Sequence, residues 1–183
     1  MNLLENNNKE QLEKIGIIAI KILNRFEIGL AIAAILSFTA MTQRIEFGNV
    51  FLIIILSLLS ILYFFKAFAI LDDPLATGIE IFLTKLYTWS LSIIMLGITF
   101  VMNRWPMWDT QLTIGVMTLF IVTIFIIFIK AKKPELKVFS SKTIYRAIIV
   151  LIIGAFLLFT PADKLSEIGI ISPPDQVEQV DNN

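Results

Sequence analysis

The sequence predicts an all-α protein, a polytopic bundle of transmembrane helices, and three observations lead to this prediction. Of the 183 residues, 57% are hydrophobic, and they are gathered into long runs, which is the pattern of membrane spans and not of a globular core. Polar and charged residues separate these runs as short loops. When the runs alternate across a bilayer, 12 of the 15 Lys and Arg residues fall on one side, as expected for a cytoplasmic face. We expect five spans, with four as the alternative.

The N-terminal segment, 1–25, is polar at its start and then predicts an amphipathic helix. On a helix, Lys14, Lys21 and Arg25 form a narrow basic stripe, with apolar residues on the other side. Such a helix either lies on an anionic membrane surface or extends the first span into the cytoplasm. No cleavable signal peptide is evident, so the first span is expected to act as an uncleaved signal.

The first predicted span, 26–42, contains small residues at regular spacing. Gly29, Ala33 and Ser37 recur every four residues and so share one face of the helix. Small residues at this spacing let a second helix approach closely. These three residues are therefore our candidate helix-packing face, although small residues are also common in membrane helices that have no such role.

The second predicted span, 50–71, contains the aromatic and basic run Tyr63-Phe64-Phe65-Lys66, which is typical of a membrane interface. Its only polar residues near the middle are Ser57 and Ser60, which are expected to bond to the backbone of their own helix. Asp73-Pro74 then predicts a helix cap and start.

A short amphipathic turn is expected before the third span, 85–102. Beyond that span, Pro106 stops the helix, and two flanking tryptophans suit the level of the lipid headgroups. Asp109 follows and is expected to cap the fourth span, 111–130.

The loop after the fourth span is the most strongly basic part of the chain. Such clusters attract anionic lipid with about 1 kcal/mol per residue near the surface. The same charges also suffice as a simple determinant of topology. The candidate anionic-lipid contacts are Lys130, Lys132, Lys133, Lys137, Lys142 and Arg146.

The fifth predicted span, 144–160, is short, and Arg146 near its start is expected to extend its charge toward the headgroups. A re-entrant segment or an interfacial helix is the alternative, which would leave four spans. The acidic outer tail, 161–183, predicts a brief helix to Gly169 and then disorder. The transmembrane domain is thus 26–160, and no internal repeat is visible in it.

The distribution of charge predicts an integral plasma-membrane or inner-membrane protein with a cytoplasmic N-terminus and, with five spans, an outer C-terminus. The totals of 15 basic and 15 acidic residues suggest no nucleic-acid partner. Expected partners are the bilayer, including its anionic lipids, and a membrane protein or further copies of this chain.

Several kinds of chemistry are unlikely for this chain. It has no Cys and no His, the residues that supply thiolates, the commonest general base and the commonest metal ligand. No ionisable residue stands in the middle of a predicted span; Glu27, at the start of the first, is expected to pair with Arg25 or to face the headgroups. We therefore predict no catalytic, cofactor-binding or metal-binding residues, and no enzymatic activity.

These observations favour a small accessory, anchoring or assembly subunit of a membrane complex. The alternative function is a small oligomeric channel, a permease subunit or a membrane-permeabilising protein, built around the hydroxyl-bearing helix faces. An intramembrane enzyme remains possible only if a partner supplies the missing groups.

Overall fold

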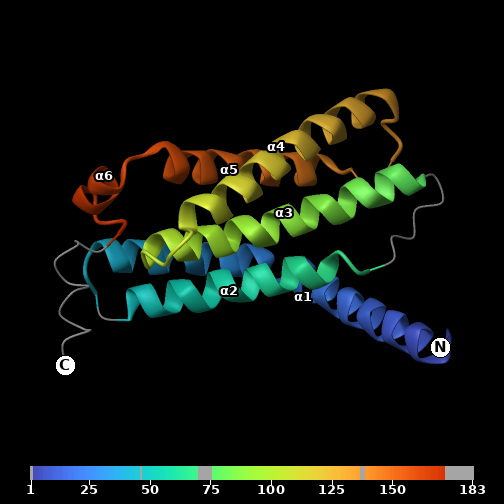
Figure 1. Cartoon of the computed structure of the whole chain (residues 1–183), viewed down its shortest axis with the longest axis horizontal. Helices are drawn as coiled ribbons and strands as arrows, with labels where there is room; N and C mark the ends of the chain where they lie inside the picture. The colour runs from blue at the N-terminus through green and yellow to red at the C-terminus, as the bar shows by residue number, and fades with distance from the viewer. Residues whose placement is uncertain (1, 46, 70–75, 137–138, 172–183) are drawn as a thin grey trace.

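A computed structural model of the chain describes residues 2–45, 47–69, 76–136 and 139–171, and every regular element in them is a helix (Figure 1). The helices are α1 (Asn2–Thr42), α2 (Gly48–Lys66), α3 (Gly78–Met102), α4 (Trp108–Lys132), α5 (Ser141–Phe159) and α6 (Ala162–Glu167). The predicted all-α bundle is confirmed.

Consecutive long helices run antiparallel, so their connections alternate between two ends of the bundle (Figure 1). α1 packs on α2, α2 on α3 and α3 on α4, and α5 returns along α4 and α3. We call the end where α2 and α4 finish and α3 and α5 begin the charged end. The opposite end, with the turns around Arg44 and Arg104 and the short helix α6, is the turn end.

Four of the described helices, α2 to α5, are long and apolar enough to cross a membrane. The chain is therefore an integral, multi-pass membrane protein. These helices correspond to the last four predicted spans. α5 is one of them, although the four-span alternative left this segment out.

α1 is one continuous helix that joins the predicted amphipathic segment to the first predicted span, 26–42. The amphipathic segment and the first predicted span thus form a single helix, and the position of the amphipathic segment relative to the membrane stays a prediction. Gly16 lies against the end of α2, because a Cβ added to it would be 2.5 Å from the Ala69 nitrogen. The first part of α1 projects sideways from the bundle at the charged end (Figure 1). Since α1 is not one of the four helices above, the count of five spans stays a prediction.

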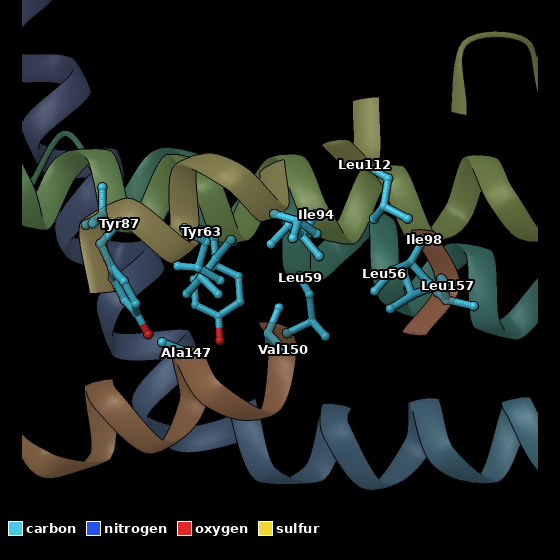
Figure 2. Close-up of a cluster of buried hydrophobic side chains, with 14 of the residues drawn as sticks. Leu56, Leu59, Tyr63, Tyr87, Ile94, Ile98, Leu112, Ala147, Val150 and Leu157 are labelled. Atoms are coloured by element: carbon cyan, nitrogen blue, oxygen red, sulfur yellow. The ribbon is translucent and has the colours of Figure 1, made fainter. Parts of the chain in front are cut away.

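The core lies mainly between α2, α3, α4 and α5, with Ala19 and Leu23 of α1 joining it, and most of its side chains are aliphatic (Figure 2). Its labelled residues are Leu56, Leu59, Tyr63, Tyr87, Ile94, Ile98, Leu112, Ala147, Val150 and Leu157. Glycines bring the helices close together: a Cβ on Gly115 would lie 2.7 Å from Ile94 Cγ1, and one on Gly154 would lie 2.7 Å from Val116 Cγ2. Close contact at small residues is how membrane helices commonly associate.

The outer faces of the helices are also apolar. Ile28 on α1, Ile54 on α2, Phe120 on α4 and Ile152 on α5 each expose more than half of their surface. Apolar side chains on both the inner and the outer faces are expected for helices that lie in hydrocarbon, where there is no water to favour a polar exterior.

The two turns at the turn end share one backbone geometry. Arg44 and Arg104 have positive φ angles of 56° and 51°. In each turn the arginine N–H bonds to the carbonyl three residues before it, and the next N–H bonds to the carbonyl five residues before it. This is a Schellman motif, a helix C-cap that usually contains Gly. No internal repeat is visible in the sequence, yet the α1–α2 and α3–α4 hairpins turn in the same way.

A pair of serines links α2 to α3 within the bundle. Ser60 Oγ donates to the Ser92 carbonyl at 3.0 Å and lies 2.9 Å from Ser92 Oγ. The prediction that Ser60 bonds to its own helix is therefore wrong, because the neighbouring backbone comes within reach at this small-residue contact. Thr118 on α4, in contrast, donates to the Ile114 carbonyl of its own helix at 2.7 Å.

Two predicted features near helix starts have different outcomes. Asp109 does not cap α4: the N-cap is Met107, with φ of 64°, and Asp109 lies in the first turn, where a carboxylate suits the helix dipole. The brief helix predicted after Pro161 is confirmed as α6. Asp73-Pro74 and the predicted disorder of the final residues lie outside the described residues.

Candidate functional site, a polar cluster at the charged end

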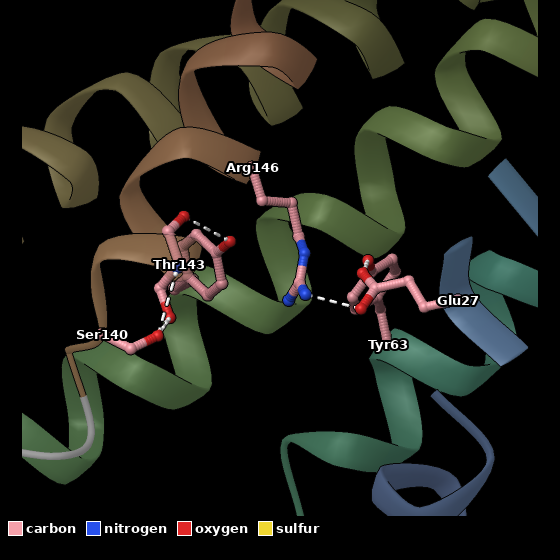
Figure 3. Close-up of polar contacts among 6 residues, drawn as sticks. Glu27, Tyr63, Ser140, Thr143 and Arg146 are labelled. Carbon is pink, nitrogen blue, oxygen red and sulfur yellow. Dashed lines mark hydrogen bonds and ion pairs between the residues drawn. The ribbon is translucent and has the colours of Figure 1, made fainter. Parts of the chain in front are cut away.

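Three polar side chains from three helices meet inside the charged end (Figure 3). Tyr63 of α2 donates its hydroxyl to Glu27 Oε1 on α1. Arg146 of α5 donates from Nη2 to Glu27 Oε2 at 2.5 Å. The Arg146 guanidinium also lies 6.0 Å from the centroid of the Tyr63 ring. We call Glu27, Tyr63 and Arg146 the polar cluster.

The start of α5 holds Arg146 in place. Ser140 is the N-cap, and its Oγ accepts from the Thr143 N–H at 3.4 Å. Tyr87 of α3 donates its hydroxyl to the Thr143 carbonyl at 3.0 Å. These contacts fix the first turn of α5 against α3, so Arg146, less than one turn further on, faces α1 and α2 (Figure 3).

The polar cluster is largely enclosed. Tyr63 is 3% exposed, and the side chains of Glu27 and Arg146 are 19% and 26% exposed. A charge this close to hydrocarbon is costly unless it is paired. Because Glu27 accepts from both neighbours, its carboxylate ties the first, second and fifth long helices together across 119 positions of sequence.

Glu27 pairs with Arg146 and not with Arg25, and Arg146 is directed toward α1 and α2. Contact of either residue with the lipid headgroups stays a prediction. Each finds its partner on another helix, and a sequence pattern within one helix cannot show this. Tyr63 was expected only as an interfacial aromatic residue.

Glu80, which was not among the predicted site residues, forms a second polar contact at this end. It is 3% exposed. Its Oε2 accepts from the N–H and the hydroxyl of Thr77, the N-cap of α3, at 2.5 and 2.9 Å. Lys133 donates to its Oε1 at 2.8 Å. The signal was available, since Thr77 and Glu80 have the spacing of a capping box directly before an apolar run.

The candidate lipid-binding residues are in varied environments. Besides Lys133 and Arg146, Lys130 also makes internal contacts, donating to the Pro134 and Leu136 carbonyls at 2.5 and 3.0 Å. Lys132 lies 4.4 Å from the Phe128 ring centroid and, like Lys142, is exposed. Lys137 lies outside the described residues. Lipid contact by this set stays a prediction.

The candidate helix-packing face on α1 makes no close contact at its glycine. A Cβ added to Gly29 would meet nothing within 4 Å, whereas Gly16 on the same helix lies against α2. Ala33 and Ser37 are half-buried. The part of this face around Gly29 is thus open to lipid or to another molecule, and packing on it stays a prediction.

The described residues contain no group of three or more His, Cys, Asp or Glu side chains that could hold a metal ion. No family model, curated protein or solved structure matches the chain. Function therefore has to be inferred from the contacts of the chain itself.

Proposed function

We propose that this chain is a non-enzymatic accessory, anchoring or assembly subunit of a complex in the plasma or inner membrane. The observation that carries the proposal is the use made of its polar side chains. Glu27, Arg146, Glu80 and Lys133 are joined in contacts between helices, and Ser60 is bonded to a neighbouring helix. These groups hold a scaffold together.

The outer surface supports the same proposal. Large apolar side chains are exposed on α1, α2, α4 and α5, and they can contact either lipid or the helices of a partner. The first part of α1 adds a helical projection to the side of the bundle (Figure 1). A rigid bundle with one projecting helix is suited to holding other subunits in position.

We further propose that the charged end and the N-terminus are cytoplasmic and the C-terminus lies outside. The support is the charge distribution: the connections at the charged end and the projecting part of α1 carry most of the basic residues. The chain has no Cys, so single cysteines can be placed at Asn2, Ser141 and Gln179. A membrane-impermeant thiol reagent applied to intact cells should label only the cysteine at Gln179. Labelling of a cysteine at Asn2 or Ser141 would show that the orientation is the opposite of the one proposed.

Co-purification in a gentle detergent tests the subunit role. We expect a partner at fixed stoichiometry, and we expect the abundance of this chain to fall when that partner is deleted. If the chain is instead alone or only homo-oligomeric, the accessory role is wrong. Solute flux in liposomes that contain only this chain would then establish the channel or permease alternative, especially if replacement of Ser60 altered that flux.

A further inference from the structure

The α1–α2 and α3–α4 hairpins are alike beyond the arginines of their turns. Thr39 and Thr99 lie equally far before those arginines, and each donates its hydroxyl to the carbonyl four residues earlier, at 2.9 and 3.0 Å. Equally far after the arginines come Phe47 and Met107, the N-caps of α2 and α4, with φ angles of 67° and 64°. The two hairpins are therefore two copies of one structural unit.

α5 stands where a third unit would begin. It follows α4 through a connection at the charged end, as α3 follows α2, and it packs on α4 as α3 packs on α2. In each of the first two units, a long second helix returns from the turn end along the first helix. In the described part of the chain beyond α5, the only helix is the short α6 (Figure 1). No long helix of the described residues therefore stands beside α5 as α2 stands beside α1.

One face of α5 carries a continuous row of large, exposed apolar side chains. These residues recur at helical spacing, so they lie on the same side of the helix. We call them the open stripe: Tyr145, Ile149, Ile152, Phe156 and Phe159, which are 67%, 59%, 65%, 49% and 80% exposed. Only 22% of the apolar part of α5 is buried, against 39% of α2 and of α4 and 56% of α3. α5 is thus the least covered of the four spans.

The second helices of the two complete units indicate what would fit beside α5. Both cross from the turn end to the charged end, antiparallel to the first helix of their unit. Both also finish with basic residues: Lys66 ends α2, and Lys130 and Lys132 lie in the last turn of α4. A helix in the corresponding place beside α5 would run antiparallel to it and have Lys or Arg at the charged end, where such residues suit the lipid headgroups.

Small residues on the second helices let the first helices approach. A Cβ on Gly48 of α2 would lie 2.6 Å from the Met41 nitrogen, and one on Gly115 of α4 would lie 3.1 Å from the Ile94 nitrogen. The open stripe has only large side chains, so small residues have to come from the other helix. Two open stripes could not supply them to each other. The open Gly29 of a second copy lies on α1, which crosses in the same direction as α5, so a different protein fits better.

We propose that the open stripe binds a transmembrane helix of the partner subunit, antiparallel to α5. That helix presents small residues to the stripe and ends in Lys or Arg at the level of the charged end. This inference rests on the accessory role proposed above, and it names the surface and the kind of helix through which that role is carried out.

Co-purification of the full-length chain in a gentle detergent tests the surface. Ile152→Ala with Phe156→Ala should lower the amount of bound partner about tenfold. The matched control is Ile54→Ala with Phe120→Ala on α2 and α4, where the side chains are 56% and 52% exposed, and it should retain the partner. Because both pairs change only outward-facing side chains, both proteins should unfold as wild type does.

The outcomes separate this inference from the accessory role. If wild type binds a partner and the α5 variant keeps it, or the control loses it equally, the accessory role stands and the open stripe is not its surface. If wild type itself binds no partner, the accessory role fails, and this inference fails with it.

A photoreactive amino acid at Ile152, used in native membranes, tests the identity of the bound helix. We expect a cross-link to the co-purifying partner, within a transmembrane segment that is followed by Lys or Arg on the side of the charged end. The same amino acid at Ile54 or Phe120 should link only lipid. Lipid alone at Ile152, a second copy of this chain, or a segment parallel to α5 would each overturn the proposal.

Discussion

The two ends of the bundle are held together by different means. At the charged end, Glu27 and Arg146 join α1 to α5, and Glu80 and Lys133 join the start of α3 to the end of α4. At the turn end, α1 and α3 finish in backbone motifs built within a few residues around Arg44 and Arg104. The side-chain link there is between neutral groups: Asn49 Nδ2 at the start of α2 donates to Asn103 Oδ1 at the end of α3, at 3.2 Å.

The difference follows from how each connection is made. A short turn satisfies its own carbonyls and fixes two helices as a hairpin with local hydrogen bonds. Such a turn cannot position the fifth long helix against the first. The fifth long helix is positioned by side chains that meet only after folding. At the edge of the hydrocarbon an ion pair favours one arrangement of the helices, because any arrangement that leaves a charge unpaired is costly. The charged end should therefore be the more sensitive to substitution.

Breaking the polar cluster should have the largest effect on stability. Glu27→Gln or Arg146→Gln leaves the other charge enclosed without its counter-ion, which should lower the free energy of unfolding by about 3 kcal/mol. The measurement is equilibrium unfolding in mixed micelles by added sodium dodecyl sulfate. The double variant should lose less than the sum of the two singles. Single variants that match wild type would show that the ion pair contributes nothing.

Two glycines on α1 compare a packed site with an open one. In Gly16→Ala, the new Cβ would sit 2.5 Å from the Ala69 nitrogen, so α1 has to move away from α2, with an expected loss of about 2 kcal/mol. Gly29→Ala meets nothing within 4 Å and should raise helix stability by about 0.5 kcal/mol. The same unfolding assay measures both. A large loss at Gly29 would instead reveal a partner on that face.

Acidic residues in the first turns of α3 and α4 compare the two ends directly. Glu80→Ala should lower the free energy of unfolding by about 1.5 kcal/mol, because the Thr77 donors and Lys133 lose their acceptor. Asp109→Ala at the turn end should cost about 0.5 kcal/mol, since this exposed carboxylate acts mainly through the helix dipole. Equal losses of unfolding free energy in Glu80→Ala and Asp109→Ala would contradict the expected difference in sensitivity between the two ends.

The turns themselves should tolerate change best. Arg104 has a positive φ, which Gly adopts without strain but Ala does not. Arg104→Gly should therefore be neutral or stabilising by up to about 0.5 kcal/mol, and Arg104→Ala should be no better than wild type. A stable Ala variant beside an unstable Gly variant, in the same assay, would contradict the observed geometry.

Several residues show which contacts could be predicted from the sequence and which could not. The capping box of Thr77 and Glu80 lies within four consecutive residues and could have been predicted. The third Glu80 contact, to Lys133, could not, since it joins two helix ends. Ser60 donates to the backbone of α3, whereas a hydroxyl in a helix usually donates to a carbonyl of its own helix. The two similar turns at Arg44 and Arg104 have no Gly at the position where a Schellman motif usually contains one. The sequence therefore did not predict these motifs.

The sequence alone determined that the chain is an all-helical membrane protein with alternating connections, because the length and apolar composition of each segment decide whether it can lie in hydrocarbon. Only the tertiary structure decided that Glu27 meets Arg146 and that Gly16, not Gly29, lies against a helix. Those outcomes depend on how each helix is rotated and which neighbour it meets, and both are set by packing between segments distant in sequence.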